Sequence, residues 1–299
     1  MLQQKQVKSV LNKHKKRDSW FLDDYSVNPY EGCSCNCQYC YIRGSKYGEN
    51  LEEKLAVKVN ALEVLEKQLA ARAKKGQYGI VVVGSATDAY MHQESTYRMT
   101  GGMLKLLLKY RFPVFISTKS ALITRDIELL KAIDNAAILP PDLQGRLQRG
   151  VILSLSVSSM DKQVTDQLEP GTIPPLQRME IVQQLNKAGF LTGVNAIPTL
   201  PFISDTDEEL EKIVTAAKTH GASFILVGGL TLFGEQTGDS KTLFYKFLQR
   251  YDPALVEKYQ KLYGTYPYPP RYYQEDLARR AGLICQKHHL RTSIIEEHV

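Results

Sequence analysis

Residues 28–41 read Asn-Pro-Tyr-Glu-Gly-Cys-Ser-Cys-Asn-Cys-Gln-Tyr-Cys-Tyr, and this stretch holds four of the five cysteines of the chain. Such crowding does not suit core packing, because adjacent turns cannot all face one apolar interior. A disulfide is a poor explanation, since cysteines one or two residues apart rarely reach the geometry that it needs. Thiolates on a short loop suit zinc or an iron–sulfur cluster. The stretch therefore predicts a metal site.

The spacing of the cysteines bears on which metal is bound. A structural zinc site usually takes four ligands in two separated pairs, and the only distant cysteine is Cys285. Cys33, Cys37 and Cys40 form the pattern C-x3-C-x2-C, which would leave one iron of a [4Fe–4S] cluster without a protein ligand. This pattern resembles the radical S-adenosylmethionine (SAM) superfamily, in which the open iron binds the amino and carboxylate groups of the cofactor. Zinc stays as the alternative.

The two remaining cysteines are interpreted as residues that do not bind metal. Cys35 lies between two expected ligands and is read as a residue of the loop, with a competing ligand as the alternative. Cys285 falls in a predicted amphipathic helix, where a free cysteine behaves as a small buried apolar residue.

Composition sets the broad class of the protein. The chain is 43% hydrophobic and 23% charged, as in ordinary globular proteins. It contains no apolar run as long as a transmembrane helix, and no apolar segment follows the N-terminal lysines as in a secretory signal. Together with clustered free thiols, this predicts a cytoplasmic protein without a membrane partner. The net charge of +6 is compatible with a nucleic-acid partner without demanding one.

Strand-like and helix-like segments alternate from about residue 54, with apolar β-branched runs typical of strands buried on both faces. Asn60 and Glu63 form the pattern of a capping box at the start of the first helix. A helix is predicted from Pro174 to Ala188, closed by Gly189, and another from Asp205 or Thr206 to about Thr219. Strands are predicted at 79–84, 113–118, 151–157, 191–197 and 224–228, and the segment entering the cysteine loop would be a sixth. Alternating β and α segments imply a parallel sheet, and six strands are too few for a closed eight-stranded barrel. The fold class is therefore α/β, an open partial (β/α)6 barrel.

Three regions are expected along the chain. Residues 1–24 form a basic extension, interpreted as a solvated terminus with phosphate contact as the alternative. Residues 25–250 form the barrel. Residues 251–299 form a tyrosine-rich C-terminal appendage that ends in a helix; we expect its tyrosines to pack against the barrel, with stacking on a planar substrate as the alternative.

Polar residues follow several predicted strands, and these strand ends are the natural site positions in a parallel sheet. Ser85, Lys119 and Ser156 occupy such positions, and an apolar strand edge lies near Ala196 and Ile197. Together they indicate a pocket for a zwitterionic ligand that carries a ribose. A lysine suits its carboxylate, hydroxyls suit its ribose, and an apolar edge suits its adenine.

Four segments sharpen the resemblance. The NPYxGC opening, the TDAY segment at 87–90, the LEPGT segment at 168–172 and the IPxLPFISD segment at 197–205 are similar to the spore photoproduct lyase-related branch of radical SAM proteins. The similarity covers about residues 25–235. It implies that SAM is contacted by six residues, namely Tyr39, Tyr41, Ser85, Lys119, Ser156 and Ala196.

One position departs from that branch. The lyase has a hydrogen-donor cysteine immediately before the serine of the second strand, and this chain has Gly84. Strict spore photoproduct lyase activity is therefore not expected. Tyr90 and Tyr97 are the candidates for a substitute redox side chain.

The function that these residues predict is that of a radical SAM enzyme. The reduced cluster would cleave SAM to a 5′-deoxyadenosyl radical, which abstracts hydrogen from a substrate, and the cofactor supplies the chemistry. The resemblance implies an electron donor of the flavodoxin or ferredoxin type, and a lesion in DNA or other nucleic acid as a candidate substrate. The alternative is a non-catalytic nucleic-acid-binding protein that a metal at the cysteine loop stabilises.

Overall fold

The centre of the molecule is a curved, mostly parallel sheet. The computed structural model describes residues 2–45 and 55–295, and within these residues seven strands pair in the order β10-β9-β8-β7-β6-β3-β2. The edge strands β2 and β10 do not pair with each other, so the sheet stays open. The six parallel strands are β3 (Asp23–Val27), β6 (Ile80–Val83), β7 (Val114–Thr118), β8 (Val151–Ser156), β9 (Leu191–Thr199) and β10 (Phe224–Gly229). The predicted partial barrel is confirmed, with β2 (Asn12–Lys13) added antiparallel at one edge.

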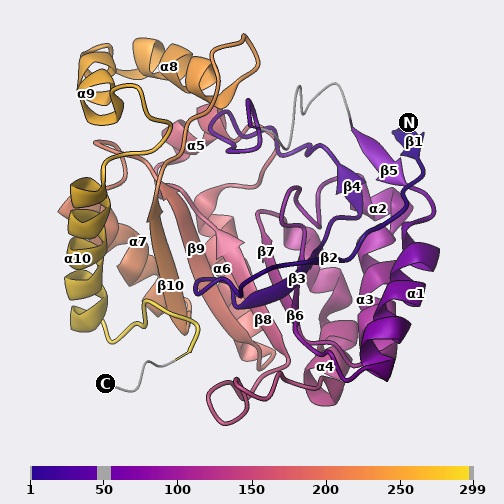
Figure 1. Cartoon of the computed structure of the whole chain (residues 1–299). Coiled ribbons are helices and arrows are strands. Elements are labelled where there is room, and N and C mark those ends of the chain that lie inside the picture. The colour runs from indigo at the N-terminus through magenta and orange to yellow at the C-terminus, as the bar shows by residue number, and fades with distance from the viewer. Residues whose placement is uncertain (1, 46–54, 296–299) are drawn as a thin grey trace.

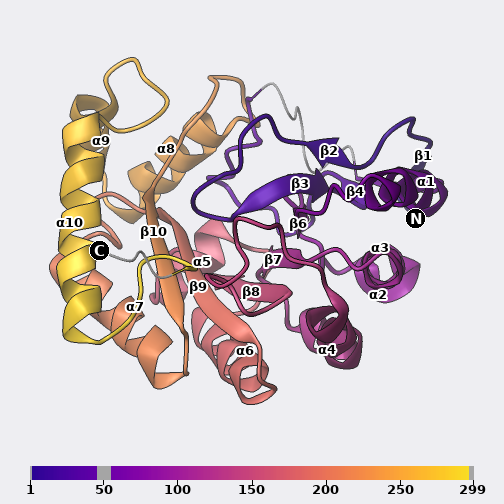
Figure 2. The ribbon, with the colours of Figure 1, turned by 60° about the horizontal axis from the view of Figure 1, so that its bottom comes forward.

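Helices cover the outer face of this sheet, as the connections between parallel strands require. Figure 2 shows them as an arc around the strands. They are α1 (Ala61–Lys74), α3 (Met99–Lys109), α4 (Ile127–Ala136), α6 (Pro175–Lys187), α7 (Asp207–Thr219) and α10 (Arg271–Lys287). A short α2 (Glu94–Tyr97) and the 3-10 helix η1 (Ala121–Asp126) precede α3 and α4.

The apolar runs of the strands are explained by burial on both faces. Val81 and Val83 belong to a core cluster shared with the outer helices, whereas Ile80 and Val82 belong to a second cluster that includes Phe115. Alternate side chains of a strand point to opposite faces. A strand covered on both sides therefore reads as a continuous apolar run.

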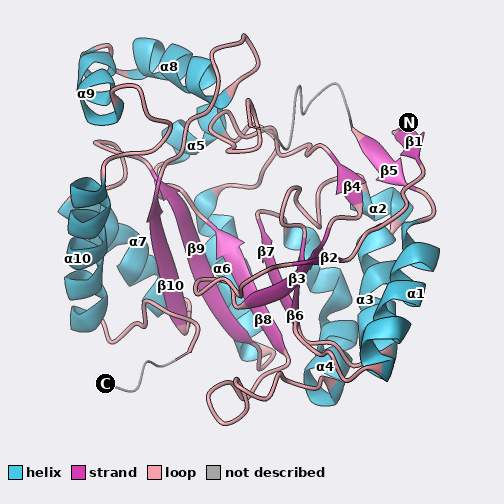
Figure 3. Cartoon of the chain, viewed as in Figure 1, coloured by secondary structure: helices cyan, strands magenta, loops and turns pink. Residues whose placement is uncertain are grey.

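A third core cluster lies at the end of the sheet where the parallel strands finish. It is built from α5 (Lys162–Leu168), α8 (Ser240–Tyr251) and α9 (Ala254–Tyr263), and it includes Tyr39 of the cysteine loop. Figure 1 shows α8 and α9 gathered at this end, and Figure 3 shows the loops that surround it. The cysteine loop thus packs on a helical subdomain as well as on the barrel.

Some local signals gave the right helix ends. α6 starts after Pro174 and stops before Gly189, which has φ +93°, as expected for a left-handed C-terminal position. Thr206 caps α7, because its Oγ1 accepts a hydrogen bond from Glu209 N at 3.3 Å. Cys285 is buried in α10, as predicted.

Most side chains of the N-terminal extension are exposed, as expected of a solvated terminus, but part of its backbone is paired in strands. Residues of β1 (Gln3–Lys5) pair with β5 (Ala56–Lys58), which also pairs with β4 (Tyr30–Glu31). The predicted capping role of Asn60 is wrong. Its Oδ1 accepts from Val7 N and its Nδ2 donates to Val7 O, both at 2.9 Å. The Asn60 side chain is thus hydrogen-bonded to a backbone segment distant in the chain instead of capping its own helix.

The division of the chain into three regions, with boundaries after residues 24 and 250, stays a prediction. No helix in residues 2–45 and 55–295 combines the length and apolar character that a bilayer crossing requires.

Candidate functional site

A cavity of about 940 Å³ lies inside the barrel and extends to the cysteine loop. Its wall is formed by that loop, by the ends of several parallel strands and by part of the N-terminal extension. The residues that the sequence singled out and that line it are Cys33, Cys37, Tyr39, Cys40, Tyr41, Ser85, Lys119 and Ser156. The fold therefore brings the cysteine loop and most of the predicted SAM contacts to one cavity.

Backbone turns shape the cysteine loop. Cys40 N donates to Cys37 O at 3.2 Å, and Arg43 Nε donates to the same oxygen at 3.0 Å. Among the residues that the structure describes, no three His, Cys, Asp or Glu side chains form a group that could hold a metal ion. A [4Fe–4S] cluster makes a different demand, since it is a larger group held by thiolates. Three thiols on one wall of a roomy cavity fit that donor chemistry.

The fourth loop cysteine has its own partners. Cys35 is buried, and its Sγ donates to Asp88 Oδ2 at 3.6 Å. A hydrogen bond between the thiols of Cys33 and Cys35 lowers the pKa of Cys33 and raises that of Cys35 well above the ordinary value. Burial raises the pKa of Cys37 and of Cys40. That Cys35 does not bind metal stays a prediction.

Lys119 and Ser156 come together at the ends of β7 and β8. Lys119 Nζ donates to Ser156 Oγ at 2.7 Å and lies 5.9 Å from the centre of the Tyr39 ring. Burial acts to lower the pKa of Lys119, but the electrostatic influence of Cys37 and Glu169 outweighs it, and the pKa is raised. The wall thus carries a persistent ammonium group, which suits a carboxylate.

Tyr41 and Ser85 are joined across the cavity wall. Tyr41 Oη donates to the backbone oxygen of Ser85 at 2.6 Å, and Asn28 Nδ2 donates to Ser85 Oγ at 3.1 Å. Asn28 Oδ1 also accepts from Ala86 N at 2.8 Å. The asparagine that opens the cysteine stretch therefore fixes the end of β6, a role that its sequence position did not reveal.

Three of the predicted site residues lie outside the cavity wall of the described chain. Ala196 packs in the core, while its neighbours Asn195 and Ile197 line the cavity, as alternation along a strand requires. Tyr90 is fully buried and donates to Asp126 Oδ2 at 3.1 Å. Tyr97 Oη accepts from Leu2 N at 3.2 Å. The location of the two tyrosines gives no support to a redox role at this cavity.

Gly84 lines the cavity in a conformation that excludes a side chain. Its φ is +89°, and a Cβ added there would lie 2.8 Å from Ala89 N. Contact of this kind with backbone cannot be relieved by a rotamer change. A cysteine at this position would force the turn after β6 to move.

Two further features of the site are decided by contacts between distant segments. The first is Asp88, whose carboxylate accepts from Tyr90 N, Thr118 Oγ1 and Lys119 N at 2.8, 2.6 and 2.8 Å, besides the Cys35 thiol. The second is the N-terminal extension, from which seven residues line the cavity, namely His14, Lys16, Arg17, Asp18, Ser19, Phe21 and Asp23. The sequence places Asp88 in the TDAY segment and the basic residues in one stretch, but it does not show which distant segments they contact.

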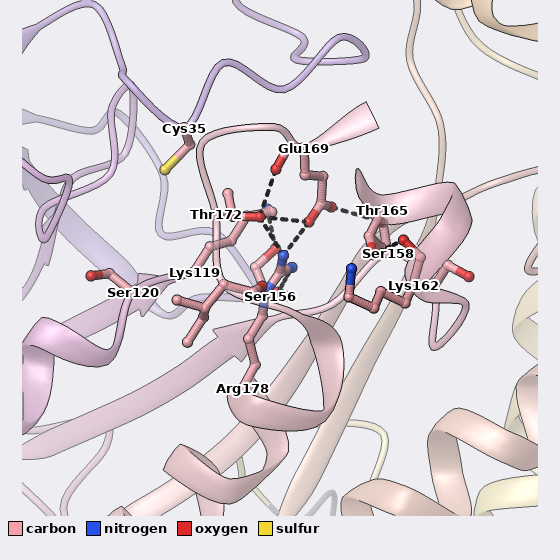
Figure 4. Close-up of polar contacts among 12 residues, drawn as sticks. Cys35, Lys119, Ser120, Ser156, Ser158, Lys162, Thr165, Glu169, Thr172 and Arg178 are labelled. Carbon is pink, nitrogen blue, oxygen red and sulfur yellow. Dashed lines mark hydrogen bonds and ion pairs between the residues drawn. The ribbon is translucent and has the colours of Figure 1, made fainter. Parts of the chain in front are cut away.

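A buried ion pair lies beside this wall. Arg178 Nη2 is 2.5 Å from Glu169 Oε2, and both side chains are fully buried. Glu169 also accepts hydrogen bonds from Ser158 Oγ, at 2.6 Å, and from Tyr39 Oη. Burial acts to raise the pKa of Glu169, but Lys119 and Arg178 outweigh it, so the pKa is lowered and the carboxylate is ionised. Figure 4 shows Glu169 and Arg178 directed toward each other.

Comparisons with known proteins agree with this geometry. The family described as the Radical SAM superfamily matches residues 27–217. An uncharacterized protein of Mycobacterium tuberculosis (strain H37Rv) is 30% identical over 272 residues, which are 89% of this chain and 75% of that protein. An uncharacterized protein of Methanocaldococcus jannaschii is 24% identical over 187 residues, 61% of this chain and 63% of that protein.

Solved structures of spore photoproduct lyase mutants are similar in fold. One superposes with a TM-score of 0.62 at 15% sequence identity, covering 93% of this chain and 78% of the lyase chain. Another, with bound AdoMet and dinucleoside spore photoproduct, has a TM-score of 0.61 at 16% identity and covers 91% of this chain and 76% of that one. At these identities the likeness concerns the fold.

Proposed function

The chain belongs to the radical SAM superfamily, and from this premise we propose that it is an enzyme that holds a [4Fe–4S] cluster at Cys33, Cys37 and Cys40. With its cofactor bound, the reduced cluster supplies the electron that cleaves SAM to a 5′-deoxyadenosyl radical, which takes a hydrogen atom from the substrate. The observation that carries the proposal is that the three cysteines share one cavity with the Lys119–Ser156 pair.

The residues of the chain have separate tasks in this proposal. The ammonium of Lys119, held by Ser156 Oγ, faces the carboxylate of SAM. Polar groups of the cofactor are bound by Ser85, which follows β6, and by Tyr41 of the cysteine loop. Asn195 and Ile197 line the cavity on either side of Ala196, and this strand edge faces the adenine.

The function is tested by anaerobic reconstitution of the full chain. Iron, sulfide and zinc are determined, and 5′-deoxyadenosine is assayed by chromatography after dithionite and SAM are added. We expect about four irons per chain, as in a [4Fe–4S] cluster, with release of 5′-deoxyadenosine. Zinc in place of iron, without cleavage of SAM, would contradict the proposal and favour the metal-stabilised nucleic-acid-binding alternative, which the comparisons do not support.

For the substrate we propose a nucleic-acid lesion, with electrons supplied by a flavodoxin or ferredoxin type of donor. The support is the basic N-terminal extension, from which Lys16 and Arg17 reach the cavity wall, and the fold shared with a lyase whose structure holds a dinucleoside spore photoproduct. In the same assay, lesion-bearing DNA should increase 5′-deoxyadenosine release. Because Gly84 supplies no thiol, we do not expect conversion of spore photoproduct to two thymidines.

Lys119→Met is expected to weaken SAM binding by about ten- to hundredfold, since a hydrogen bond to a charged group contributes about 1.5–3 kcal/mol. The substitution keeps most of the side-chain volume and removes the ammonium. Equilibrium binding of SAM to the reconstituted protein measures the effect. The matched control is Lys131→Met, because Lys131 is exposed on α4, paired with Glu128 and distant from the cavity wall. Equal affinity in both variants would show that Lys119 does not bind the carboxylate.

A further inference from the structure

The segment from Leu168 to Thr172 binds the cysteine loop at three points. Gln38 N donates to Leu168 O at 2.8 Å, and Gly171 N donates to Cys35 O at 3.1 Å. Tyr39 Oη donates to Glu169. A Cβ added at Gly171 would lie 2.1 Å from Ser34 O, so the two segments touch through their backbones. The segment is therefore a support for the loop between Cys33 and Cys40.

Glu169 is held more firmly than a surface carboxylate could be. Its oxygens accept from Ser158 Oγ and face the Arg178 guanidinium, and neither side chain of the ion pair reaches solvent. Thr172 Oγ1 donates to Glu169 O at 2.8 Å and accepts from Arg178 Nη2 at 2.5 Å. These hydrogen bonds fix the conformation of the Glu169 side chain, to which Tyr39 is hydrogen-bonded.

Arg178 connects the same support to the Lys119–Ser156 pair. Its Nη1 donates to Ser156 O at 2.9 Å and its Nε donates to Ile173 O at 2.8 Å. Ser156 Oγ is the atom that accepts from Lys119 Nζ. A continuous series of direct contacts thus runs from Tyr39 through Glu169 and Arg178 to Ser156. The close-up in Figure 4 shows this series from Glu169 onward.

We propose that the buried Glu169–Arg178 pair is a positioning element that fixes the cysteine loop relative to the Lys119–Ser156 pair. Its consequence for catalysis rests on the proposed function, because these two parts of the wall are where the cluster and the carboxylate of SAM would be held. A buried ion pair often adds little stability compared with apolar residues of the same volume. A requirement for fixed geometry gives this pair a reason to be present.

Glu169→Gln tests the proposal, because it removes the charge and keeps the shape. The chain offers a matched control in Glu94→Gln. Glu94 is also buried, accepts from Tyr30 Oη and pairs with Arg125 at 2.8 Å. Its other bonds go to Thr100 N and Gly101 N, and in the described chain none of them involves residues 33–40. Each substitution removes one buried charge, but only the Glu169 side chain contacts the cysteine loop.

The first readout is amide hydrogen exchange of the loop peptide in the full chain, before and after reconstitution. We expect Glu169→Gln to speed exchange at residues 33–40 by about tenfold or more, since a charged hydrogen-bond partner is lost. Glu94→Gln should leave exchange of this peptide within about twofold of wild type. The second readout is iron per chain together with the electron paramagnetic resonance signal of the reduced cluster. We expect less iron and a changed signal in Glu169→Gln only.

The outcomes separate this proposal from the proposed function. Unchanged loop exchange and iron content in a folded Glu169→Gln protein would overturn the positioning role. A wild-type chain that takes up no iron, with faster loop exchange in Glu169→Gln, would refute the cluster and keep the positioning role. If Glu169→Gln does not fold, Tyr39→Phe removes only the hydroxyl that reaches Glu169, and unchanged loop exchange in that variant would also overturn the role.

Discussion

Cys37→Ala is expected to lower the iron content of the reconstituted chain from about four atoms to fewer than about one, and to abolish 5′-deoxyadenosine release. The reason is that the C-x3-C-x2-C pattern provides three thiolates, and two cannot hold the cluster against loss to solvent. Iron and sulfide analysis, visible absorbance and SAM cleavage measure the effect. Circular dichroism should stay as in wild type, because Cys37 lies on a loop rather than in a helix or strand.

Cys35→Ala is the matched control, two residues away on the same loop. Its thiol is directed to Asp88, at 3.6 Å, so we expect this variant to keep about four irons. Loss of iron from Cys35→Ala as complete as from Cys37→Ala would show that Cys35 is a ligand. Full iron content in Cys37→Ala would mean that the ligand set of Cys33, Cys37 and Cys40 is wrong.

Arg178→Leu is expected to reduce the free energy of unfolding by about 3–5 kcal/mol, the usual cost of leaving one charge of a buried pair without its partner. Arg178 is fully buried, and of the two cations that lower the pKa of Glu169 in the described chain, Lys119 would remain. Urea unfolding of the metal-free chain measures the change. The double variant Glu169→Gln, Arg178→Leu should recover part of the loss, since it buries no unpaired charge. A double variant less stable than Arg178→Leu would contradict this explanation.

The effect of Arg178→Leu should also depend on pH. The pKa of Glu169 is lowered in the folded wild type from its ordinary 4.5. Its charge therefore contributes stability above that value, and the contribution is lost as pH falls through the folded pKa. Without Arg178, burial raises the pKa of Glu169 relative to wild type. Protonation of Glu169 then removes the cost of burying an unpaired charge. The stability gap between the two proteins should therefore narrow from pH 7.5 to about pH 5, and a gap that widens would contradict the assignment.

The sequence by itself determined the features that depend on neighbouring residues. Apolar β-branched runs such as residues 80–83 predicted strands buried on both faces, because a strand buried on both faces carries apolar residues at consecutive positions. The spacing of Cys33, Cys37 and Cys40 on one short loop resembled the radical SAM superfamily, to which the chain belongs. Pro174 and Gly189 marked the ends of α6. In each case the physical signal lies within a few residues of the feature that it predicts.

Only the tertiary structure decided the contacts between distant segments. Asn60 had a good local pattern for a cap, but the backbone of Val7 offered its carboxamide two hydrogen bonds instead. Along β9, Asn195 and Ile197 line the cavity wall, whereas Ala196 between them packs in the core. Tyr39 and Glu169 lie 130 positions apart in the chain. Such pairs form because the sheet brings its strand ends to one place, and no short stretch of sequence records that arrangement.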